Sequence, residues 1–147
     1  MTLNDLRSQG RLRPHRTSRS EVDDLLRLAD RGIADAQVPG VSADGRFMMA
    51  YDAALSLAGI PLHCAGFRTD GPRHHQTTFA ALPIVMGAEM SEAASYFDAC
   101  RAKRNTSAYD RGGRTSDSEV EELVGEALAF RERVLAWLRA NHPALCP

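Results

Sequence analysis

Residues 45–59 read Gly45-Arg46-Phe47-Met48-Met49-Ala50-Tyr51-Asp52-Ala53-Ala54-Leu55-Ser56-Leu57-Ala58-Gly59, and this stretch decides the fold. Its apolar side chains recur at the spacing of an α-helix and cover nearly the whole circumference of that helix. A helix that is apolar nearly all round is usually central in its bundle, and small side chains let neighbouring helices approach closely. The sequence therefore predicts a central helix, with Ser42 positioned to cap its start.

A second helix is predicted on the N-terminal side, over about Ser20–Gln37. Ser18 and Glu21 have the spacing of a capping box, and the apolar residues that follow recur at helical intervals. Val38-Pro39-Gly40 ends this helix, because proline and glycine do not continue it.

The C-terminal half predicts further helices after a loop over residues 66–73. One begins near His74 or the next residue, and Pro83 inside it predicts a kink or a break. Gly87 offers a stop, and Ser91 marks a fresh helical start.

The last helix is predicted from a capping box formed by Ser118 and Glu121, and it runs to about Ala140. Strand-like alternation appears nowhere in the sequence. Four or five helices of this length, joined by short loops, predict an all-α fold, namely an antiparallel up-and-down helical bundle.

Three regions divide the chain. We expect a flexible basic N-terminal arm over residues 1–17, the helical bundle over residues 18–141 and a C-terminal tail over residues 142–147. Residues 1–19 contain five arginines but only one acidic residue, Asp5. The arm is therefore interpreted either as a solvated tail or as a segment that contacts phosphates. These arginines are Arg7, Arg11, Arg13, Arg16 and Arg19.

Composition sets limits on the class of protein. The chain has 147 residues with 44% hydrophobic content, enough for one globular domain with a core. A net charge of -1 gives no global attraction to nucleic acid or acidic membranes. No apolar run approaches the roughly 18 residues that span a bilayer, and the start of the chain lacks the apolar core of a signal peptide. We expect a cytoplasmic protein without a membrane partner.

The cysteines and histidines do not form a recognised metal or disulfide pattern. Three cysteines with wide spacing and no Cys-x-x-Cys pair are typical of buried free thiols. A metal site assembled from neighbours across the 66–73 loop matches no standard zinc spacing, so neither a metal nor a cofactor is expected. The residues considered are His63, Cys64, His74 and His75, with Cys100 and Cys146 as the other thiols.

The stretch richest in chemically capable side chains is Cys100-Arg101-Ala102-Lys103-Arg104-Asn105-Thr106-Ser107-Ala108-Tyr109-Asp110. At about 100° per residue, Arg104 falls on one helical stripe with Phe97 and other apolar residues. Burying an unpaired arginine costs on the order of several kcal/mol, so this residue should meet a carboxylate, an interface or a phosphate. An acid such as Asp52 or Glu122 would serve, with Tyr109 covering the end of the bundle.

Taken together, these segments resemble HEPN-domain proteins. The resemblance spans roughly residues 18–141: the Ala-rich stretch, the loop into His74-His75, then Arg104-Asn105-x-x-x-Tyr109-Asp110, and a final Glu- and Ala-rich helix. HEPN proteins are up-and-down helical bundles that often dimerise. Many are metal-independent ribonucleases, frequently toxins encoded beside a minimal nucleotidyltransferase. Their active motif is Arg, four to six residues and then His, commonly with a polar residue after the Arg.

Carried over to this chain, Arg104 matches the motif arginine and Asn105 the polar residue after it, while Tyr109 stands at the histidine position. A histidine exchanges protons near neutral pH, whereas tyrosine, with a pKa near 10, stays largely protonated. The resemblance therefore implies a dimeric module that binds RNA, a nucleotide or a partner protein, with little or no catalysis.

Two other functions remain open. One is a metal-independent endoribonuclease of toxin-antitoxin type that uses Arg104, with Asn105 and Tyr109 as the other catalytic candidates. The other is a structural partner of a nucleotidyltransferase. The candidates for contact with nucleic acid are Arg101, Lys103, Arg104, Arg111 and Arg114.

Overall fold

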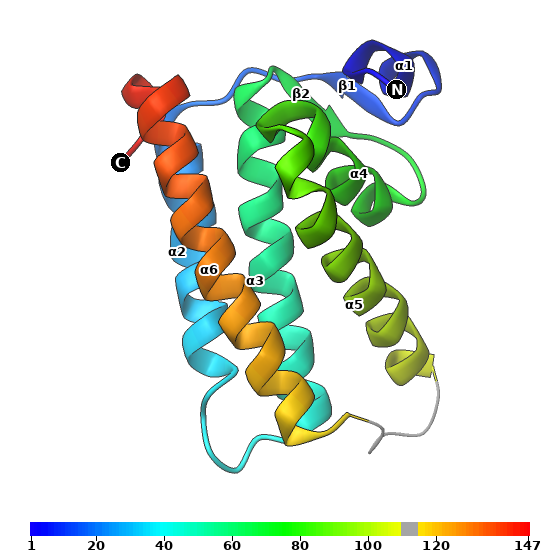
Figure 1. Cartoon of the computed structure of the whole chain (residues 1–147), viewed down its shortest axis with the longest axis vertical. Coiled ribbons are helices and arrows are strands. Elements are labelled where there is room, and N and C mark those ends of the chain that lie inside the picture. The colour runs from blue at the N-terminus through cyan, green and yellow to red at the C-terminus, as the bar shows by residue number, and fades with distance from the viewer. Residues whose placement is uncertain (110–114) are drawn as a thin grey trace.

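The structure is a computed structural model that describes the backbone of residues 1–109 and 115–147, and the side chains of residues 1–105 and 115–147. The expected all-α helical bundle is confirmed (Figure 1). Its helices are α2 (Arg19–Asp35), α3 (Ala43–Cys64), α4 (His74–Met86), α5 (Ser91–Tyr109) and α6 (Asp117–Asn141). The shorter elements are α1 (Leu3–Ser8), η1 (Ala88–Met90), η2 (Pro143–Leu145) and the strands β1 (Leu12–Pro14) and β2 (Phe67–Thr69).

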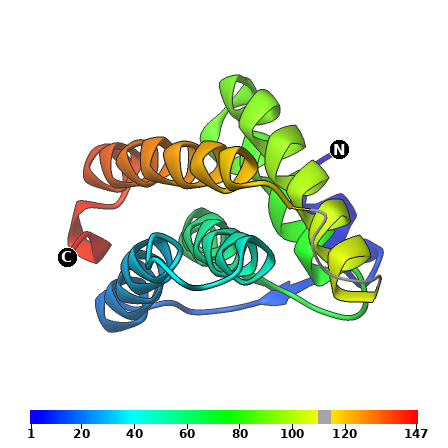
Figure 2. The same ribbon diagram turned by 90° about the horizontal axis from the view of Figure 1, so that it is seen from below.

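Helix α3 lies at the centre of the bundle, as its sequence predicts. It packs against α2, α4, α5 and α6, and in the view along the bundle α2 lies on one side of it, α6 above it and α4 and α5 on the other side (Figure 2). Its buried residues include Tyr51 and Leu57, which are fully buried, and a series of alanines. The phenylalanines of the neighbouring helices pack on one another, with Phe97 of α5 between Phe79 of α4 and Phe130 of α6.

The N-terminal segment differs from the flexible arm expected over residues 1–17. Helix α1 begins with a capping box at Thr2, and β1 pairs antiparallel with β2. Leu6 and Leu12 are buried in a small second core with Leu62 and Ala81. The two buried leucines and the paired strand attach the N-terminal segment to the bundle. The sequence shows no apolar periodicity there, because each leucine lies in a short element.

The C-terminal tail expected over residues 142–147 also packs on the bundle. Residues 143–145 form η2, and Leu145 and Cys146 lie partly buried against the main core. Apolar contact therefore fixes the direction of the chain after α6.

Two helix boundaries differ in detail from the expected ones. Helix α6 is capped by Ser116, whose capping box is closed by Glu119 in place of the predicted Ser118 and Glu121. Helix α4 continues through Pro83 and ends at Met86, because a proline in the last turn removes only one backbone hydrogen bond.

Close packing of α2 on α3 depends on Gly32. A Cβ atom added there would lie 2.9 Å from the carbonyl oxygen of Met49 and 3.1 Å from the Cβ of Ala53. The two helix backbones therefore meet at a distance that only glycine allows.

We predict that Gly32→Ala lowers the free energy of unfolding by about 1–3 kcal/mol, because the added methyl group overpacks the α2–α3 contact. Gly125→Ala is the matched control, since a Cβ at this exposed site in α6 meets nothing within 4 Å. Because alanine has a higher helix propensity than glycine, Gly125→Ala should raise the free energy of unfolding by up to about 1 kcal/mol. Urea denaturation followed by circular dichroism measures both changes. Equal stabilisation by the two substitutions would contradict this account of the packing.

Candidate functional site

Arg104 lies on α5 with its side chain only 25% exposed. Its guanidinium carbon is 5.5 Å from the centroid of the Tyr51 ring, within the range of a cation–π contact. Among the described residues, the nearest carboxylate is that of Asp52, with Nη2 and Oδ1 3.9 Å apart, which is too long for a hydrogen bond. The buried Nε has no hydrogen-bond partner among the described residues. The charge of Arg104 is thus only loosely compensated.

Tyr51 connects this arginine to a histidine. Its ring is fully buried, and its hydroxyl oxygen is hydrogen-bonded to Nδ1 of His75 on α4 at 3.0 Å. Burial raises the pKa of Tyr51 well above its usual value, although Arg104 and Arg101 act in the opposite direction. Burial also lowers the pKa of His75 to about 4, with smaller contributions from His74, Arg104 and Arg101. At neutral pH both partners of this hydrogen bond are therefore uncharged.

Two carboxylates, those of Asp52 and Asp98, lie near Tyr51 and the two arginines. Asp98 accepts a hydrogen bond from Nε of Arg101 at 2.8 Å, so this second arginine is well paired. Burial raises the pKa of Asp52, and the charge of Arg104 partly offsets that effect. Arg104 therefore has a weaker ion pair than Arg101. We call the side chains of the following residues the Arg104 cluster: Tyr51, Asp52, His75, Asp98, Arg101 and Arg104.

A groove of about 520 Å³ adjoins this cluster. It is lined by residues of α4 and α5, including Asp98, and by Arg11 and Arg73. The groove offers apolar surface beside positive charge next to the arginines of α5.

The structure separates the predicted site residues. Arg101 and Arg104 both face Tyr51 and His75, whereas Lys103 pairs with Glu119 of α6. Asn105 is exposed, so it does not contribute to the buried part of the cluster. The side chain of Tyr109 and residues Arg111 and Arg114 lie outside the described residues.

Sequence reasoning missed Tyr51 and His75 as members of the site. Helical periodicity places Tyr51 on the apolar face of the central helix, yet a buried tyrosine usually needs a partner for its hydroxyl group. This requirement predicts a polar residue next to the hydroxyl group of Tyr51. It does not identify that residue as His75, which lies 24 positions later in the chain.

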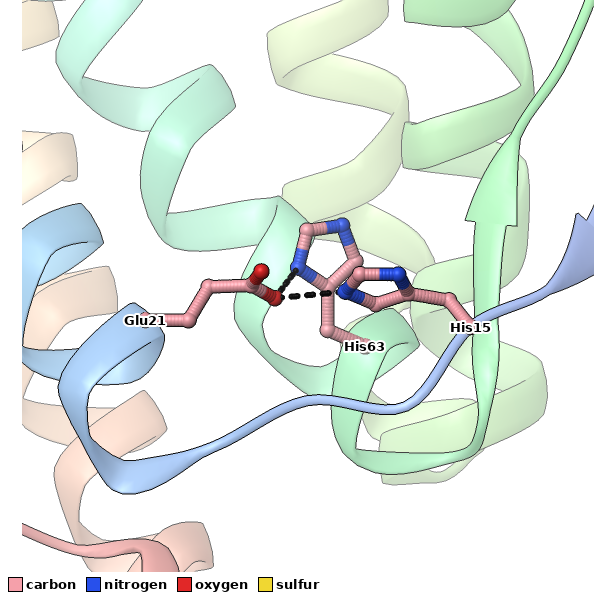
Figure 3. Close-up of side chains that lie close together, drawn as sticks. All are labelled: His15, Glu21 and His63. Carbon is pink, nitrogen blue, oxygen red and sulfur yellow. Dashed lines mark hydrogen bonds and ion pairs between the residues drawn. The ribbon is translucent and has the colours of Figure 1, made fainter.

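A second cluster joins His15, Glu21 and His63, whose imidazole rings and carboxylate converge in Figure 3. The Oε1 atom of Glu21 lies 2.7 Å from Nε2 of His15 and 2.8 Å from Nδ1 of His63, and it also accepts a hydrogen bond from Thr17. Burial acts to raise the pKa of Glu21, but the hydrogen bonds of His15 and Thr17 and the nearby histidine charges together lower it. Burial lowers the pKa of His63.

The four residues that the sequence offers as a possible metal site, His63, Cys64, His74 and His75, do not come together in the structure. His63 meets His15 and Glu21, while His74 and His75 lie together beside the Arg104 cluster. Cys64 is not part of the histidine–glutamate cluster, and burial raises its thiol pKa to about 11.

Comparison of the chain with models of protein families, with curated proteins and with solved structures finds no match in any of the three. Within the part of the chain that the structure describes, no helix combines the length and apolarity needed to cross a membrane.

We predict that His75→Gln flattens the pH dependence of stability between pH 7 and pH 4.5. The pKa of His75 is about 4 in the folded state against an ordinary value of 6.5, so the unfolded chain binds the proton more tightly. The stability contributed by neutral His75 is complete above pH 6.5 and is lost as pH falls towards 4. Urea midpoints of wild type and variant across this range measure the difference. Parallel curves would contradict the assigned environment of His75.

Proposed function

We propose that the chain is a HEPN-like helical bundle that binds RNA or a nucleotide through Arg104, with little or no catalysis of its own. The observation that carries this proposal is the incomplete pairing of Arg104. Its guanidinium lies over an aromatic ring, and the nearest carboxylate oxygen among the described residues is 3.9 Å away. Its Nε is buried without a hydrogen-bond partner among those residues, so an external ligand would meet the Nη atoms. A phosphate group accepts two parallel hydrogen bonds from such a guanidinium.

Asp52 is the natural competitor of a bound phosphate. Its side chain is 58% exposed and lies beside the same guanidinium nitrogen. A phosphate approaching Arg104 must displace this carboxylate or bind next to it, against its negative charge. Removing the charge of Asp52 should therefore strengthen binding, whereas removing Arg104 should weaken it.

The groove between α4 and α5 supports an oligonucleotide as the ligand. Arg11 and Arg73 line the groove and add positive charge, and Ala80 and Pro83 give it accessible apolar surface, whereas Phe79 is buried. A positively charged groove of this kind follows the backbone of a single-stranded nucleic acid. The resemblance to HEPN proteins adds a homodimer, in which a twofold axis brings two copies of Arg104 into one cleft.

Weak catalysis follows from the protonation states around Arg104. A general base works best with a pKa near the operating pH, whereas that of His75 is lowered to about 4 and that of Tyr51 is raised. One observation favours the alternative, a metal-independent endoribonuclease: a histidine, His75, lies in the Arg104 cluster although Tyr109 occupies the motif position.

We predict that Arg104→Ala weakens binding of a labelled single-stranded RNA by about tenfold or more at low salt, because charge-assisted hydrogen bonds contribute about 1.5–3 kcal/mol. Asp52→Asn should tighten binding. Arg139→Ala removes an exposed charge near the far end of α6 and is the matched control, with an expected change below about twofold. Fluorescence anisotropy measures all four proteins. Equal losses for Arg104→Ala and Arg139→Ala would remove Arg104 from the binding site.

Incubating the same RNA with wild type in EDTA separates the binding module from the ribonuclease. We predict no cleavage above background. Cleavage that disappears in both Arg104→Ala and His75→Gln would assign the protein to the ribonuclease class instead.

A further inference from the structure

We infer that His15, Glu21 and His63 form a binding site for a divalent transition-metal ion of the zinc type. Each residue offers one ligand atom, and the three atoms lie within 4.8 Å of one another. The site is separate from the proposed nucleic-acid site, because His63 follows Tyr51 by about 18 Å along α3.

The donor set selects the class of metal. Two imidazole nitrogens and one carboxylate oxygen suit zinc and its transition-metal neighbours, whereas magnesium and calcium prefer oxygen ligands throughout. Two histidines and one glutamate also form a known zinc coordination set, in which a water molecule takes the fourth position.

The separations of the glutamate oxygen from the two imidazole nitrogens require only a small adjustment to hold an ion. Ligand atoms arranged tetrahedrally about 2.0–2.1 Å from zinc are about 3.3 Å apart. The two imidazole nitrogens now lie 2.7 Å and 2.8 Å from Oε1 of Glu21. An outward shift of about 0.5 Å, which rotation of the glutamate side chain can supply, would open the space for the ion.

His63 provides independent support for a missing ligand. Its Nδ1 atom is buried and lies 2.8 Å from Oε1 of Glu21, yet no hydrogen bond of acceptable geometry satisfies it among the described residues. The distance fits an ion pair, whereas the geometry does not fit a hydrogen bond, and burial disfavours the charged imidazole that an ion pair requires. A metal ion bound at this nitrogen would satisfy its lone pair.

The three ligands come from different segments of the chain. His15 follows β1, Glu21 lies in the first turn of α2, and His63 lies in the last turn of α3 (Figure 3). Their side chains are 19%, 35% and 22% exposed, so an ion and a water ligand can reach them. Thr17 donates a hydrogen bond to the glutamate and helps to orient it. A bound ion would fasten the N-terminal segment to the two helices.

Titration of the EDTA-treated protein with Zn²⁺ by calorimetry tests this inference. We expect one ion per chain and a rise in the thermal unfolding midpoint, because the ion binds the folded state. His63→Gln and Glu21→Gln should each weaken binding at least tenfold. His142→Gln changes a histidine at the end of α6 and should bind zinc as the wild type does.

Co²⁺ serves as a second probe that does not depend on how stable each variant is. The wild-type complex should show the visible bands of tetrahedral cobalt without a thiolate charge-transfer band, which excludes Cys64 and Cys146 as ligands. Absence of zinc binding by the wild type, equal affinity in His63→Gln, or a thiolate band would overturn the inference.

Discussion

Burial of α3 on nearly every side is the constraint on which the rest of the structure depends. Alanines at positions such as Ala50 and Ala54 let neighbouring helices approach, and Gly32 lets the backbone of α2 meet that of α3. A polar side chain on the buried sides of such a helix must lie against a partner, whereas Asp52 on its open side reaches solvent. Tyr51 is such a side chain, and its hydroxyl group meets His75.

The candidate site follows from this burial. The Tyr51 ring lies under the guanidinium of Arg104 on α5. A carboxylate in that position would compensate the positive charge of Arg104 more fully than the aromatic ring does. The same α5 helix carries Arg101, which donates a hydrogen bond to Asp98 at 2.8 Å, so Arg104 has the weaker ion pair of these two arginines. Natural proteins tend to accept such local imperfections where a ligand completes the arrangement. The buried Nδ1 of His63, in the last turn of α3, also has no hydrogen-bond partner among the described residues.

The sequence was most informative where a pattern repeats and least informative where contacts join distant segments. Helical periodicity predicted α3 and α6, and the stripe through Arg104 predicted a partly buried arginine. The packing of Leu6 and Leu12 could not be predicted, because each lies in a short element whose partners follow much later in the chain. Local signals were also ambiguous: Glu21 fits a capping box, yet its carboxylate oxygen lies 2.7 Å and 2.8 Å from nitrogen atoms of two histidines.

The central claim is that the guanidinium of Arg104 is available to an external phosphate. Nuclear magnetic resonance of the arginine Nε–H groups tests it directly, with the Arg104 signal assigned by its loss in Arg104→Lys. On addition of a 5′-phosphorylated dinucleotide, we expect this signal to shift saturably while that of Arg139 stays in place. An unchanged Arg104 signal at saturating nucleotide, or equal shifts at every arginine, would contradict the account.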